Sequence, residues 1–460
     1  MTTRPLRVAI VGAGPAGIYA ADALMKSDAA ASRGVSIDLF DCLPAPFGLI
    51  RYGVAPDHPR IKEIIKALHR VLDKPQVRFF GNVRYGADLT LDDLHAHYHA
   101  VVFATGALQD RDLNIPGIEL GGSHGAADFV SWFNSHPDVD QTWPLEARSV
   151  AVLGVGNVAL DVARMLAKTA DELLPTEIPA HVEQGLRDNA AIDIHVFGRR
   201  GPAQAKFTPI ELRELDHSPT IEVIVEPRDL EFDEASVRAR RESKQVDMVS
   251  DTLTTWASRD PGPRPHRLHL HFFESPVEVL GTDGRVSGLR TERTELTGTG
   301  EVRGTGEHAD WDVQAVYRAV GYYSDPVAGL PFDEASGTVP NTAGRVLDEA
   351  GEPHGGVYVT GWVKRGPVGL IGHTKGDANE TVACLLEDAD QGLLAEPLHP
   401  ADSDVIAFLA RRGTEFTTWD GWYKLDAYER ALGDAHGRER VKVSTREEMV
   451  ALSRDAEDVA

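Results

Sequence analysis

Two glycine-rich motifs, each placed directly after an apolar run, are the clearest chemical signals in the sequence. Residues 12–17 read G-x-G-x-x-G after apolar residues 8–11, and residues 154–159 read G-x-G-x-x-A after residues 149–153. A glycine turn between a strand and a helix lets backbone N–H groups and the positive end of the helix hold a pyrophosphate. The sequence therefore predicts two sites for dinucleotides.

The residues that follow the next strand of each unit indicate which nucleotide is bound. Strand 35–40 ends in Asp41, whose carboxylate is placed to accept hydrogen bonds from an adenosine ribose. Strand 192–197 instead leads into Arg199 and Arg200 in a G-R-R-G segment. Two guanidiniums there suit a 2′-phosphate and favour NADP over NAD, with a solvated arginine pair as the alternative.

The order of these elements predicts how the chain divides into domains. Residues 99–106, ending in A-T-G, and residues 313–321 read as matching buried strands, and the polar, proline-bearing stretch 109–117 reads as a crossing. We expect an α/β protein with two Rossmann-like domains on a glutathione-reductase-like plan, the second, NADP-binding domain being inserted into the first. The expected bounds are 1–108 and 322–460 for the first domain, with C-terminal helices, and 109–321 for the NADP domain.

Several further elements follow from periodicity and capping patterns. We expect one helix from Pro59 with Ile61, Ile64, Ile65 and Leu68 on one buried face, and a helical insert over residues 169–189. Residues 267–296 alternate around Asp283-Gly284 and predict a hairpin. A loop over residues 362–376 is expected to enter a helix at the capping-box pattern D-x-x-E of residues 377–380. Helices are also expected near the C-terminus, on the first domain, over residues 405–412, 423–432 and 444–452.

Composition excludes several classes of function. The formal net charge of −24 over 460 residues makes nucleic acid an unsuitable partner. The two cysteines, Cys42 and Cys384, form no C-x-x-C pair, so no disulfide framework, zinc site or redox dithiol is indicated and no metal is expected. No apolar run is long enough to cross a bilayer, and a cytoplasmic location is expected.

Two nucleotide folds in one chain suggest two cofactors, FAD in the first and NADP(H) in the second. Flavin reductases that reduce disulfides need a cysteine pair beside the flavin, and the sequence has none. Electrons are therefore expected to leave for an external acceptor.

Four segments resemble the adrenodoxin-reductase-type ferredoxin–NADP⁺ reductases. They are residues 53–59 (GVAPDHP), 156–164 (GNVALDVAR), 198–215 (GRRGPAQAKFTPIELREL) and 361–367 (GWVKRGP). They occur in order and fall in both predicted domains, so the resemblance covers nearly the whole chain. It implies an FAD enzyme that passes electrons from NADPH to a ferredoxin, which in turn could supply a cytochrome P450.

The resemblance also implies which residues hold the cofactors. For FAD these are Gly12, Gly14, Ala16, Gly17, Asp41, Leu49, the backbone near Tyr85, Trp362, Gly369, Leu370 and Ile371. For NADP(H) they are Arg111, Asn157, Val158, Arg199, Arg200, Glu211 and Gly369. Trp362 would cover the flavin ring, with a core indole as the alternative.

His58 and Glu211 match the catalytic pair expected near the nicotinamide and the flavin. Glu211 would bond the carboxamide and orient the C4 hydride towards flavin N5, unless it is an exposed helix acid. A helix N-terminus disfavours the cation of His58, which suits a proton relay or an acceptor, and capping or packing is the alternative.

Three positions depart from the family pattern. Asp41 stands where relatives usually have glutamate, and Val368 and His373 stand where threonine is common. The shorter acid reduces the reach towards the ribose. The other two changes would alter the flavin's potential or its reactivity with oxygen.

The acceptor protein needs a docking face of its own. A ferredoxin is normally acidic, as this chain is, so docking requires a local basic patch. Arg238, Arg240, Arg241 and Lys244 are the best candidates and are expected on one helical stretch, with an ordinary solvated face as the alternative.

Other functions remain open on the sequence alone. An NADPH oxidase or a quinone- or diaphorase-type reductase would use no protein partner. An electron-input subunit of the glutamate-synthase type would bring cysteine-rich segments, which this sequence lacks. A nucleotide-binding sensor without turnover is a further alternative from another class.

Overall fold

A computed structural model describes residues 4–367 and 371–454, without the side chain of Ile371. The chain divides into two compact units. Unit 1 comprises residues 1–109, 134–138 and 322–460, and unit 2 comprises residues 110–133 and 139–321. The short segment 134–138, which the sequence places in the NADP domain, belongs to unit 1. Short strands β5 (Gln109–Asp110) and β15 (Tyr322–Tyr323) lie where the chain leaves unit 1 and re-enters it.

Unit 1 is built on a seven-stranded sheet. Its strand order is β16 (Asn341–Thr342), β17 (Arg345–Leu347), β18 (Pro353–Val359), β4 (Ala100–Phe103), β1 (Leu6–Val11), β2 (Val35–Phe40) and β3 (Val77–Phe80). The five strands from β18 to β3 are parallel, and β16 and β17 are added antiparallel. Because parallel sheets bury both faces, the strands read as continuous apolar runs.

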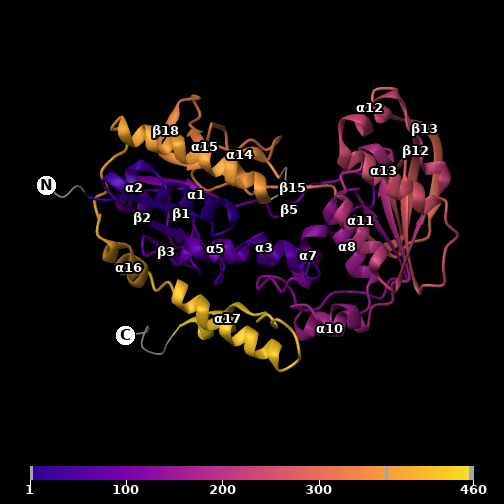
Figure 1. Ribbon diagram of the computed structural model, residues 1–460, viewed down its shortest axis with the longest axis horizontal. Coiled ribbons are helices and arrows are strands. Elements are labelled where there is room, and N and C mark those ends of the chain that lie inside the picture. The colour runs from indigo at the N-terminus through magenta and orange to yellow at the C-terminus, as the bar shows by residue number, and fades with distance from the viewer. Residues whose placement is uncertain (1–3, 368–370, 455–460) are drawn as a thin grey trace. The chain divides into compact units, whose positions relative to one another are not determined.

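Helices cover both faces of this sheet (Figure 1). Val8 and Ile10 of β1 pack into one apolar cluster, whereas Ala9 and Val11 pack into the other. The first cluster receives side chains from α1 (Pro15–Met25), α5 (Ile65–Leu72), α15 (Ile371–Asp390), α17 (Trp419–Asp434) and α18 (Arg446–Ser453). The second receives them from α6 (Leu91–His97) and α16 (Asp402–Arg411). The other described helices of unit 1 are α2 (Asp28–Ser32), α3 (Leu49–Tyr52), α4 (Pro59–Lys62) and α14 (Trp362–Arg365).

Unit 2 contains a six-stranded parallel sheet and a three-stranded antiparallel sheet. The first has the order β6 (Ser123–Gly125), β14 (Ala315–Arg318), β7 (Ser149–Leu153), β8 (Asp193–Gly198), β10 (His266–Phe272) and β9 (Ile221–Val225). The second consists of β11 (Glu274–Thr282), β12 (Arg285–Leu296) and β13 (Val302–Trp311). Val279 and Leu289 of the small sheet share an apolar cluster with Leu153 and Phe197. The small sheet therefore covers one face of the large one.

Helices and two short 3₁₀ turns complete the described part of unit 2. The helices are α7 (Ala126–Phe133), α8 (Asn157–Ala167), α9 (Ala170–Leu173), α10 (Ala180–Arg187), α11 (Pro209–His217), α12 (Glu234–Glu242) and α13 (Lys244–Ala257), of which α9 and α10 form the expected insert. The 3₁₀ turns are η1 (Pro202–Gln204) and η2 (Pro227–Asp229).

Three expected elements differ from the structure. The helix expected from Pro59 is split into α4 and α5, because Ile64 and Lys66 donate to carbonyls three residues back. Ile61, expected on the buried face, is 38% exposed. The expected hairpin is β11 and β12 around Asp283-Gly284, both with positive φ, but residues 266–272 form a parallel strand and β13 is a third partner.

The helix expected to begin at Asp377 begins instead at Ile371, and Trp362 lies in α14 rather than in a loop. Gly372 and Gly376 lie inside α15, where a β-carbon at either position would meet nothing within 4 Å. Asp377 is therefore no cap. Its carboxylate accepts the Gly361 N–H and lies 2.9 Å from Lys364 Nζ.

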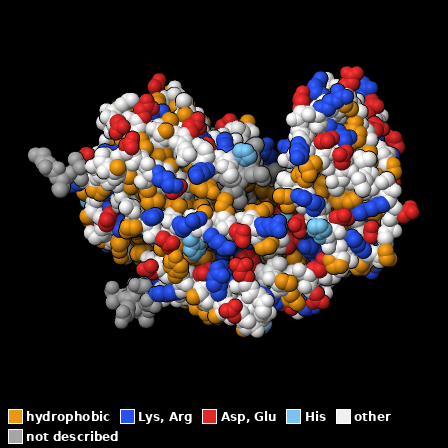
Figure 2. All heavy atoms as spheres, viewed as in Figure 1, with side chains coloured by type: hydrophobic (Ala, Val, Ile, Leu, Met, Phe, Trp, Pro, Cys, Tyr) orange, Lys and Arg blue, Asp and Glu red, His pale blue; other side chains and the backbone are white. Residues whose placement is uncertain are grey.

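The expected C-terminal helices are confirmed as α16, α17 and α18, and they pack on unit 1 as predicted. Within the described residues, no helix is long and apolar enough to cross a membrane. Figure 2 shows acidic and basic side chains interspersed over one face of the molecule.

Candidate functional site

The first glycine motif forms a turn that only glycine can adopt. Gly12 has φ +111°, and a β-carbon built there would lie 2.3 Å from the Ala104 carbonyl oxygen. A β-carbon on Gly17 would lie 2.0 Å from the Gly12 oxygen. Contacts below 3.0 Å with backbone cannot be relieved by a side-chain movement. The predicted roles in a tight turn and in close helix–strand packing are thus reflected in the geometry.

Two other segments meet the start of α1. A β-carbon on Gly48 would lie 3.1 Å from Gly14 Cα, and one on Gly361 would lie 2.7 Å from Ala16 Cβ. Leu49 and Trp362 directly follow these two glycines, so the structure brings both to the glycine loop. Gly14 is the N-cap of α1 and has no side chain to occupy its first-turn N–H groups. This cradle of backbone fits a pyrophosphate at a helix N-terminus.

Asp41 is held by the glycine loop itself. Its Oδ2 accepts the Ala13 N–H at 2.7 Å and its Oδ1 accepts the Leu43 N–H at 2.9 Å. Burial raises the pKa of this carboxyl to about 6, although both N–H groups act to lower it. The sequence alone does not predict these backbone bonds. Both oxygens of this short side chain are engaged by backbone N–H groups, one of them in the glycine loop 28 residues away in the chain.

For the other residues of unit 1 that were predicted to bind FAD or to act in catalysis, the structure gives less direct evidence of their roles. The Tyr85 hydroxyl donates to the Ala328 oxygen at 2.7 Å, and its ring lies 4.9 Å from Phe103, so its side chain serves packing. His58 is buried at the start of α4, and its side chain does not cap that helix. Val368, Gly369 and Leu370, together with the side chain of Ile371, lie outside the described residues.

The second glycine motif repeats this geometry in unit 2. Gly154 has φ +133°, and a β-carbon there would lie 2.2 Å from the Ala319 oxygen. A β-carbon on Gly156, the N-cap of α8, would meet nothing within 4 Å, which leaves room for a ligand. Asn157 Oδ1 accepts the Thr208 N–H at 3.0 Å and ties the start of α8 to the cap of α11. Val158 lies in the first turn of the same helix, half-buried.

Arg199 and Arg200 follow β8 as predicted. Arg199 is exposed, and the Thr294 hydroxyl donates to its carbonyl oxygen at 2.7 Å, which fixes the backbone of the loop. Arg200 is partly exposed and lies 3.9 Å from the exposed Glu301 carboxylate. That separation is at the limit of an ion pair, so both guanidiniums remain accessible to an anion.

Arg111 lies beside the second glycine turn. Its N–H donates to the Gly321 oxygen at 2.8 Å, and its Cδ would lie 3.3 Å from a β-carbon on Gly321. Gly321 comes two residues after Ala319, whose carbonyl packs against Gly154. The structure thus brings Arg111 close to the loop that carries Asn157 and Val158.

Glu211 is not the exposed helix acid that the sequence left open. It is buried at 4% exposure on α11, and its Oε2 lies 3.2 Å from Arg164 Nη1. Arg164, fully buried on α8, also donates to Asp161 at 2.7 Å. A buried acid of this kind is held in one orientation. The sequence pattern does not predict a role for Arg164, although this residue ends the segment G-N-V-A-L-D-V-A-R.

The four basic residues predicted for docking do not all lie on one helical stretch: Arg238, Arg240 and Arg241 lie on α12, but Lys244 begins α13, so that expectation is wrong for Lys244. Ser243 separates α12 from α13 and caps the latter by accepting the Val246 N–H at 3.4 Å. Arg238, Arg241 and Lys244 are exposed. Arg240 instead donates to Asp247 at 3.0 Å and pairs with Asp251, which offsets its charge.

Known proteins match this chain over nearly its full length. The family profile of the pyridine nucleotide-disulphide oxidoreductases matches residues 6–182. "NADPH-ferredoxin reductase FprA" of Mycobacterium tuberculosis is 41% identical, covering 98% of this chain and 99% of the relative. "NADPH:adrenodoxin oxidoreductase, mitochondrial" of Arabidopsis thaliana is 39% identical, covering 98% and 96%.

A solved structure gives the same result. The structure titled "Mycobacterium tuberculosis FprA in complex with NADPH" superposes with a TM-score of 0.91 at 39% identity, and covers 98% of this chain and 100% of the other. The two glycine cradles, the arginine pair and this full-length similarity together place the chain in the adrenodoxin-reductase-type ferredoxin–NADP⁺ reductases, a branch of the pyridine nucleotide-disulphide oxidoreductase family of flavoproteins.

Proposed function

We propose that this protein is an FAD-dependent NADPH:ferredoxin oxidoreductase. The observation that carries the proposal is the full-length similarity, at 41% identity, to a relative named for NADPH and ferredoxin. The two glycine cradles, one in each unit, supply a site for each cofactor. When bound, FAD would take a hydride from NADPH and release electrons singly, which is the conversion that an iron–sulfur acceptor requires.

Unit 1 would hold FAD through its backbone. Gly12, Gly14 and Gly17 let the loop approach the pyrophosphate, and the first-turn N–H groups of α1 would bind its oxygens. Asp41 already orders this loop through Ala13, and its carboxylate would also accept a ribose hydroxyl. Leu49 and Trp362, which flank the cradle, would pack on the flavin.

Unit 2 would hold NADP(H) by charge and by shape. Arg199 and Arg200 would donate to the 2′-phosphate, and charge-assisted hydrogen bonds of this kind are the strong ones. Asn157 and Val158 at the start of α8 would lie under the pyrophosphate. Arg111 would add a further positive charge beside the same loop.

Glu211 would set the orientation of the nicotinamide. Its carboxylate, fixed by Arg164 at 3.2 Å, would accept from the carboxamide N–H₂ and aim C4 at the flavin. His58 would accept or relay a proton near the flavin. Gly369, Leu370 and Ile371 would complete the flavin site.

The partner would be a small acidic ferredoxin. Arg238, Arg241 and Lys244 are exposed and would form its docking contacts, whereas Arg240 is engaged by Asp247 and Asp251. Such contacts raise the association rate and weaken with salt. A cytochrome P450 downstream of that ferredoxin would be the final acceptor.

Anaerobic titration of the purified yellow protein with NADPH and with NADH tests the cofactor assignment. We expect NADPH to bleach the flavin absorbance, and NADH to do so much more slowly. Glu211→Gln should keep the fold and the flavin but slow bleaching at saturating NADPH, because the nicotinamide is no longer aimed. A colourless protein, or one that NADPH fails to bleach, would indicate a sensor without turnover.

A further inference from the structure

A buried ion pair joins the short helix α14, which carries Trp362, to the long helix α15. Lys364 Nζ lies 2.9 Å from Asp377 Oδ1, and the two side chains are 6% and 8% exposed. The other carboxylate oxygen of Asp377 accepts the Gly361 N–H at the N-cap of α14. One carboxylate of α15 therefore holds α14 both by its backbone and by a side chain.

The lysine of this pair is fixed by further contacts. Lys364 Nζ donates to Thr381 Oγ1 at 3.1 Å and lies 2.6 Å from the exposed carboxylate of Glu380. The Lys364 carbonyl oxygen accepts from Asn341 Nδ2 at 3.0 Å. Because its backbone and its ammonium group are both held, this lysine keeps Asp377 in one place.

The helix that the pair holds is too short to be ordered alone. Helix α14 has four residues and is bounded by Gly361 at φ +73° and Gly366 at φ +80°. A single helical turn is not stable in water, so its conformation depends on contacts with other elements. Val363 supplies an apolar contact with one core cluster of unit 1, and Asp377 supplies the polar one.

Gly361 is also the point at which α14 meets the first nucleotide cradle. A β-carbon on Gly361 would lie 2.7 Å from Ala16 Cβ. The next residue, Trp362, is partly exposed, whereas Val363 and Lys364 are buried. A hydrogen bond that fixes the Gly361 N–H therefore also fixes the direction in which the chain enters Trp362.

Stability alone does not account for a buried ion pair at this place. Taking an ammonium and a carboxylate out of water is costly, and well-packed apolar residues of similar volume are often at least as stable. The charged pair instead adds orientation, because each of its hydrogen bonds has a preferred distance and angle. Orientation is what a short turn beside a cofactor cradle needs.

We propose that Asp377, held by Lys364, is a positioning residue that sets the orientation of Trp362 against the flavin, an inference that rests on the flavin site of the proposed function. Asp377 acts through the Gly361 N–H and the backbone of α14, and Trp362 makes the contact with the flavin. The sequence does not reveal this role, because the D-x-x-E pattern of residues 377–380 resembles a helix cap.

Visible circular dichroism of the bound flavin tests this role, because the signal reports the asymmetry of the flavin's surroundings. Asp377→Ala removes the acceptor of the Gly361 N–H, and the flavin band should change. Asp377→Asn keeps an oxygen that can accept this N–H and should retain most of the band. The Kd for FAD should rise on the order of tenfold in Asp377→Ala, as for loss of one charge-assisted hydrogen bond, and by less than about threefold in Asp377→Asn.

A double-mutant cycle with Trp362→Ala shows whether Asp377 acts through the indole. Under the proposal, Asp377→Ala changes the flavin band in the wild-type background and adds little in the Trp362→Ala background. Equal changes in the two backgrounds would mean that Asp377 acts on the flavin by another route, and would overturn the proposal.

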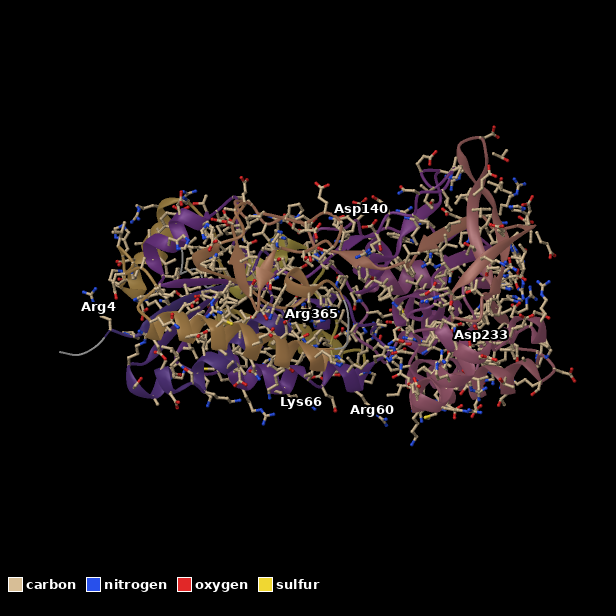
Figure 3. All side chains as sticks on the ribbon, turned by 90° about the horizontal axis from the view of Figure 1, so that it is seen from above. Arg4, Arg60, Lys66, Asp140, Asp233 and Arg365 are labelled. Atoms are coloured by element: carbon tan, nitrogen blue, oxygen red, sulfur yellow. The ribbon has the colours of Figure 1, made fainter. Side chains whose placement is uncertain are left out.

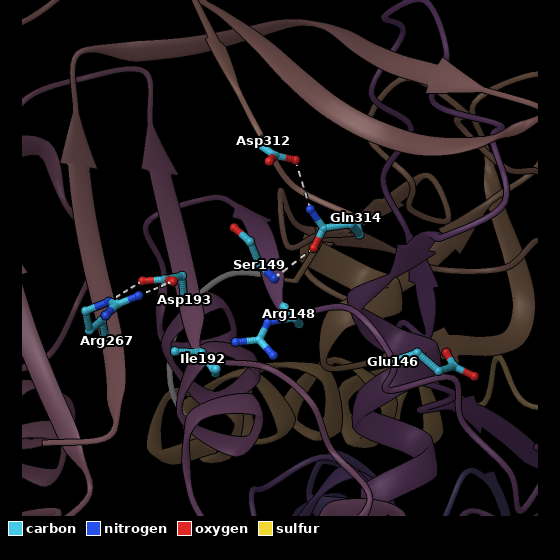
Figure 4. Close-up of a pocket in the computed structure, with 8 residues that line it drawn as sticks. All are labelled: Glu146, Arg148, Ser149, Ile192, Asp193, Arg267, Asp312 and Gln314. Atoms are coloured by element: carbon cyan, nitrogen blue, oxygen red, sulfur yellow. Dashed lines mark hydrogen bonds and ion pairs between the residues drawn. The ribbon is translucent and has the colours of Figure 1, made fainter.

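Two aspartates that hold arginines elsewhere are the controls. Asp388 lies on the same helix, α15, at 2.9 Å from Arg345 Nε. Asp193 holds Arg267 beside a cavity of about 480 Å³ in unit 2, at the amino ends of β8 and β10 (Figure 4). Asp388→Ala and Asp193→Ala each lose an ion pair, but they should keep the wild-type flavin band because these arginines lie outside α14.

Two further measurements keep the test independent of one variant. Amide hydrogen exchange of the flavin-loaded wild type should show a slowly exchanging Gly361 N–H. Far-ultraviolet circular dichroism confirms that each variant is folded. If Asp377→Ala fails to fold, Lys364→Met takes its place, because it removes the cation that holds the carboxylate and should change the flavin band in the same sense.

The outcomes separate this role from the proposed function. A rapidly exchanging Gly361 N–H, or a flavin band that Asp377→Ala and Lys364→Met leave as unchanged as Asp388→Ala does, would overturn the positioning role while the flavin remains bound. A wild-type protein that binds no flavin would instead contradict the proposed function, and the positioning role with it.

Discussion

At the scale of single residues, Gly12 is a position of the first nucleotide cradle that should tolerate substitution poorly. Replacing Gly12 with alanine should cost on the order of 3 kcal/mol or more of stability, because the new β-carbon meets backbone at 2.3 Å and φ is +111°. The purified variant should also lose its yellow flavin. Urea unfolding and the absorbance near the flavin maximum measure the two effects.

Gly413→Ala separates the clash from the cost of a positive φ. Gly413 has φ +72°, but a β-carbon there meets nothing within 4 Å. Its substitution should cost only about 1–2 kcal/mol and leave the flavin bound. Equal losses in the two variants would mean that the contact with Ala104 is not what makes Gly12 necessary.

Arg199 and Arg200 are expected to carry the preference for NADPH over NADH. Replacing both with alanine should lower the ratio of kcat/KM for NADPH to that for NADH by at least about 100-fold, since each of the two charge-assisted hydrogen bonds contributes about 1.5–3 kcal/mol. The change should appear mainly in KM for NADPH. Arg303→Ala, at an exposed arginine of the same unit, should leave the ratio unchanged. An unaltered ratio in the double variant would instead support a merely solvated arginine pair.

Several site residues could be predicted because their types are fixed by local geometry. Gly12, Gly154 and the arginine pair belong to short motifs whose spacing carries a mechanism. The partners of Asp41 and Glu211 could not be predicted in this way. Ala13 lies 28 residues from Asp41 and Arg164 lies 47 residues from Glu211, so these contacts depend on the packing of separate elements.

At the scale of elements, the C-terminal helix α17 is fixed to the first nucleotide unit by a buried acid. Glu429 is fully buried; it pairs with Arg51 and lies 3.2 Å from Arg440 Nη1, and it accepts the Val443 N–H at 3.0 Å. Glu429→Gln leaves the buried Arg51 guanidinium without its counter-charge, whereas Arg440 keeps Asp426 at 2.7 Å. It should lower the free energy of unfolding by about 3–5 kcal/mol.

The surface pair Glu63–Lys66 is the matched control for this buried network. Both side chains are exposed, and Figure 3 shows Lys66 pointing away from the body of unit 1. Glu63→Gln should therefore change stability by less than about 1 kcal/mol. Chemical denaturation of the two variants under one set of conditions makes the comparison. Similar losses would contradict the conclusion that Glu429 anchors α17 to unit 1.

The free energy of unfolding is expected to depend on pH through Asp110, which binds the start of α7, and the sign of that dependence follows from its pKa. Asp110 accepts the Ala127 N–H at 2.9 Å, and burial raises its pKa from 3.8 to about 7. A carboxyl with a raised pKa binds its proton more tightly when folded. Its contribution to stability is therefore complete below about pH 3.8 and is lost as the pH rises through about 7.

Between pH 5.5 and pH 8 this loss should reach about 2 kcal/mol, at 1.36 kcal/mol for each pH unit below the folded pKa. Asp110→Asn should remove it, so that the variant gains on the wild type as the pH rises. Asp112→Asn, at an exposed neighbour, should not. Thermal unfolding across this range is the measurement, and parallel curves for wild type and Asp110→Asn would show that the carboxyl is ionised throughout.

Elements could be predicted best where one strong pattern acts alone. The apolar runs of β1, β4 and β7 and the C-terminal helices are recognisable from periodicity and burial. The start of α15 is not recognisable in this way. The D-x-x-E pattern of residues 377–380 predicts a later start, and the glycines at 372 and 376 argue against a helix that in fact contains both of them. Similarly, β10 reads as part of a hairpin because a parallel strand and an antiparallel strand share the same alternation.

At the scale of the whole molecule, two nucleotide units of one chain serve a single transfer of electrons. Each unit carries its own sheet, glycine turn and helix N-terminus, and the similarity to NADPH-ferredoxin reductases spans both. The two cysteines, Cys42 and Cys384, form no C-x-x-C pair, which agrees with a reductase whose electron acceptor is a separate protein. If the proposed ferredoxin is acidic, the net charge of −24 means that it would have to dock on a local basic patch.

NADPH-driven reduction of cytochrome c, with and without an added small ferredoxin, tests this electron path most directly. We predict a large increase in rate that depends on ferredoxin and falls with salt. Charge reversal at Arg238 and Arg241 should reduce that increase while leaving the bleaching of the flavin by NADPH unchanged. NADPH turnover that ignores ferredoxin and yields peroxide would contradict the proposed path and identify an oxidase.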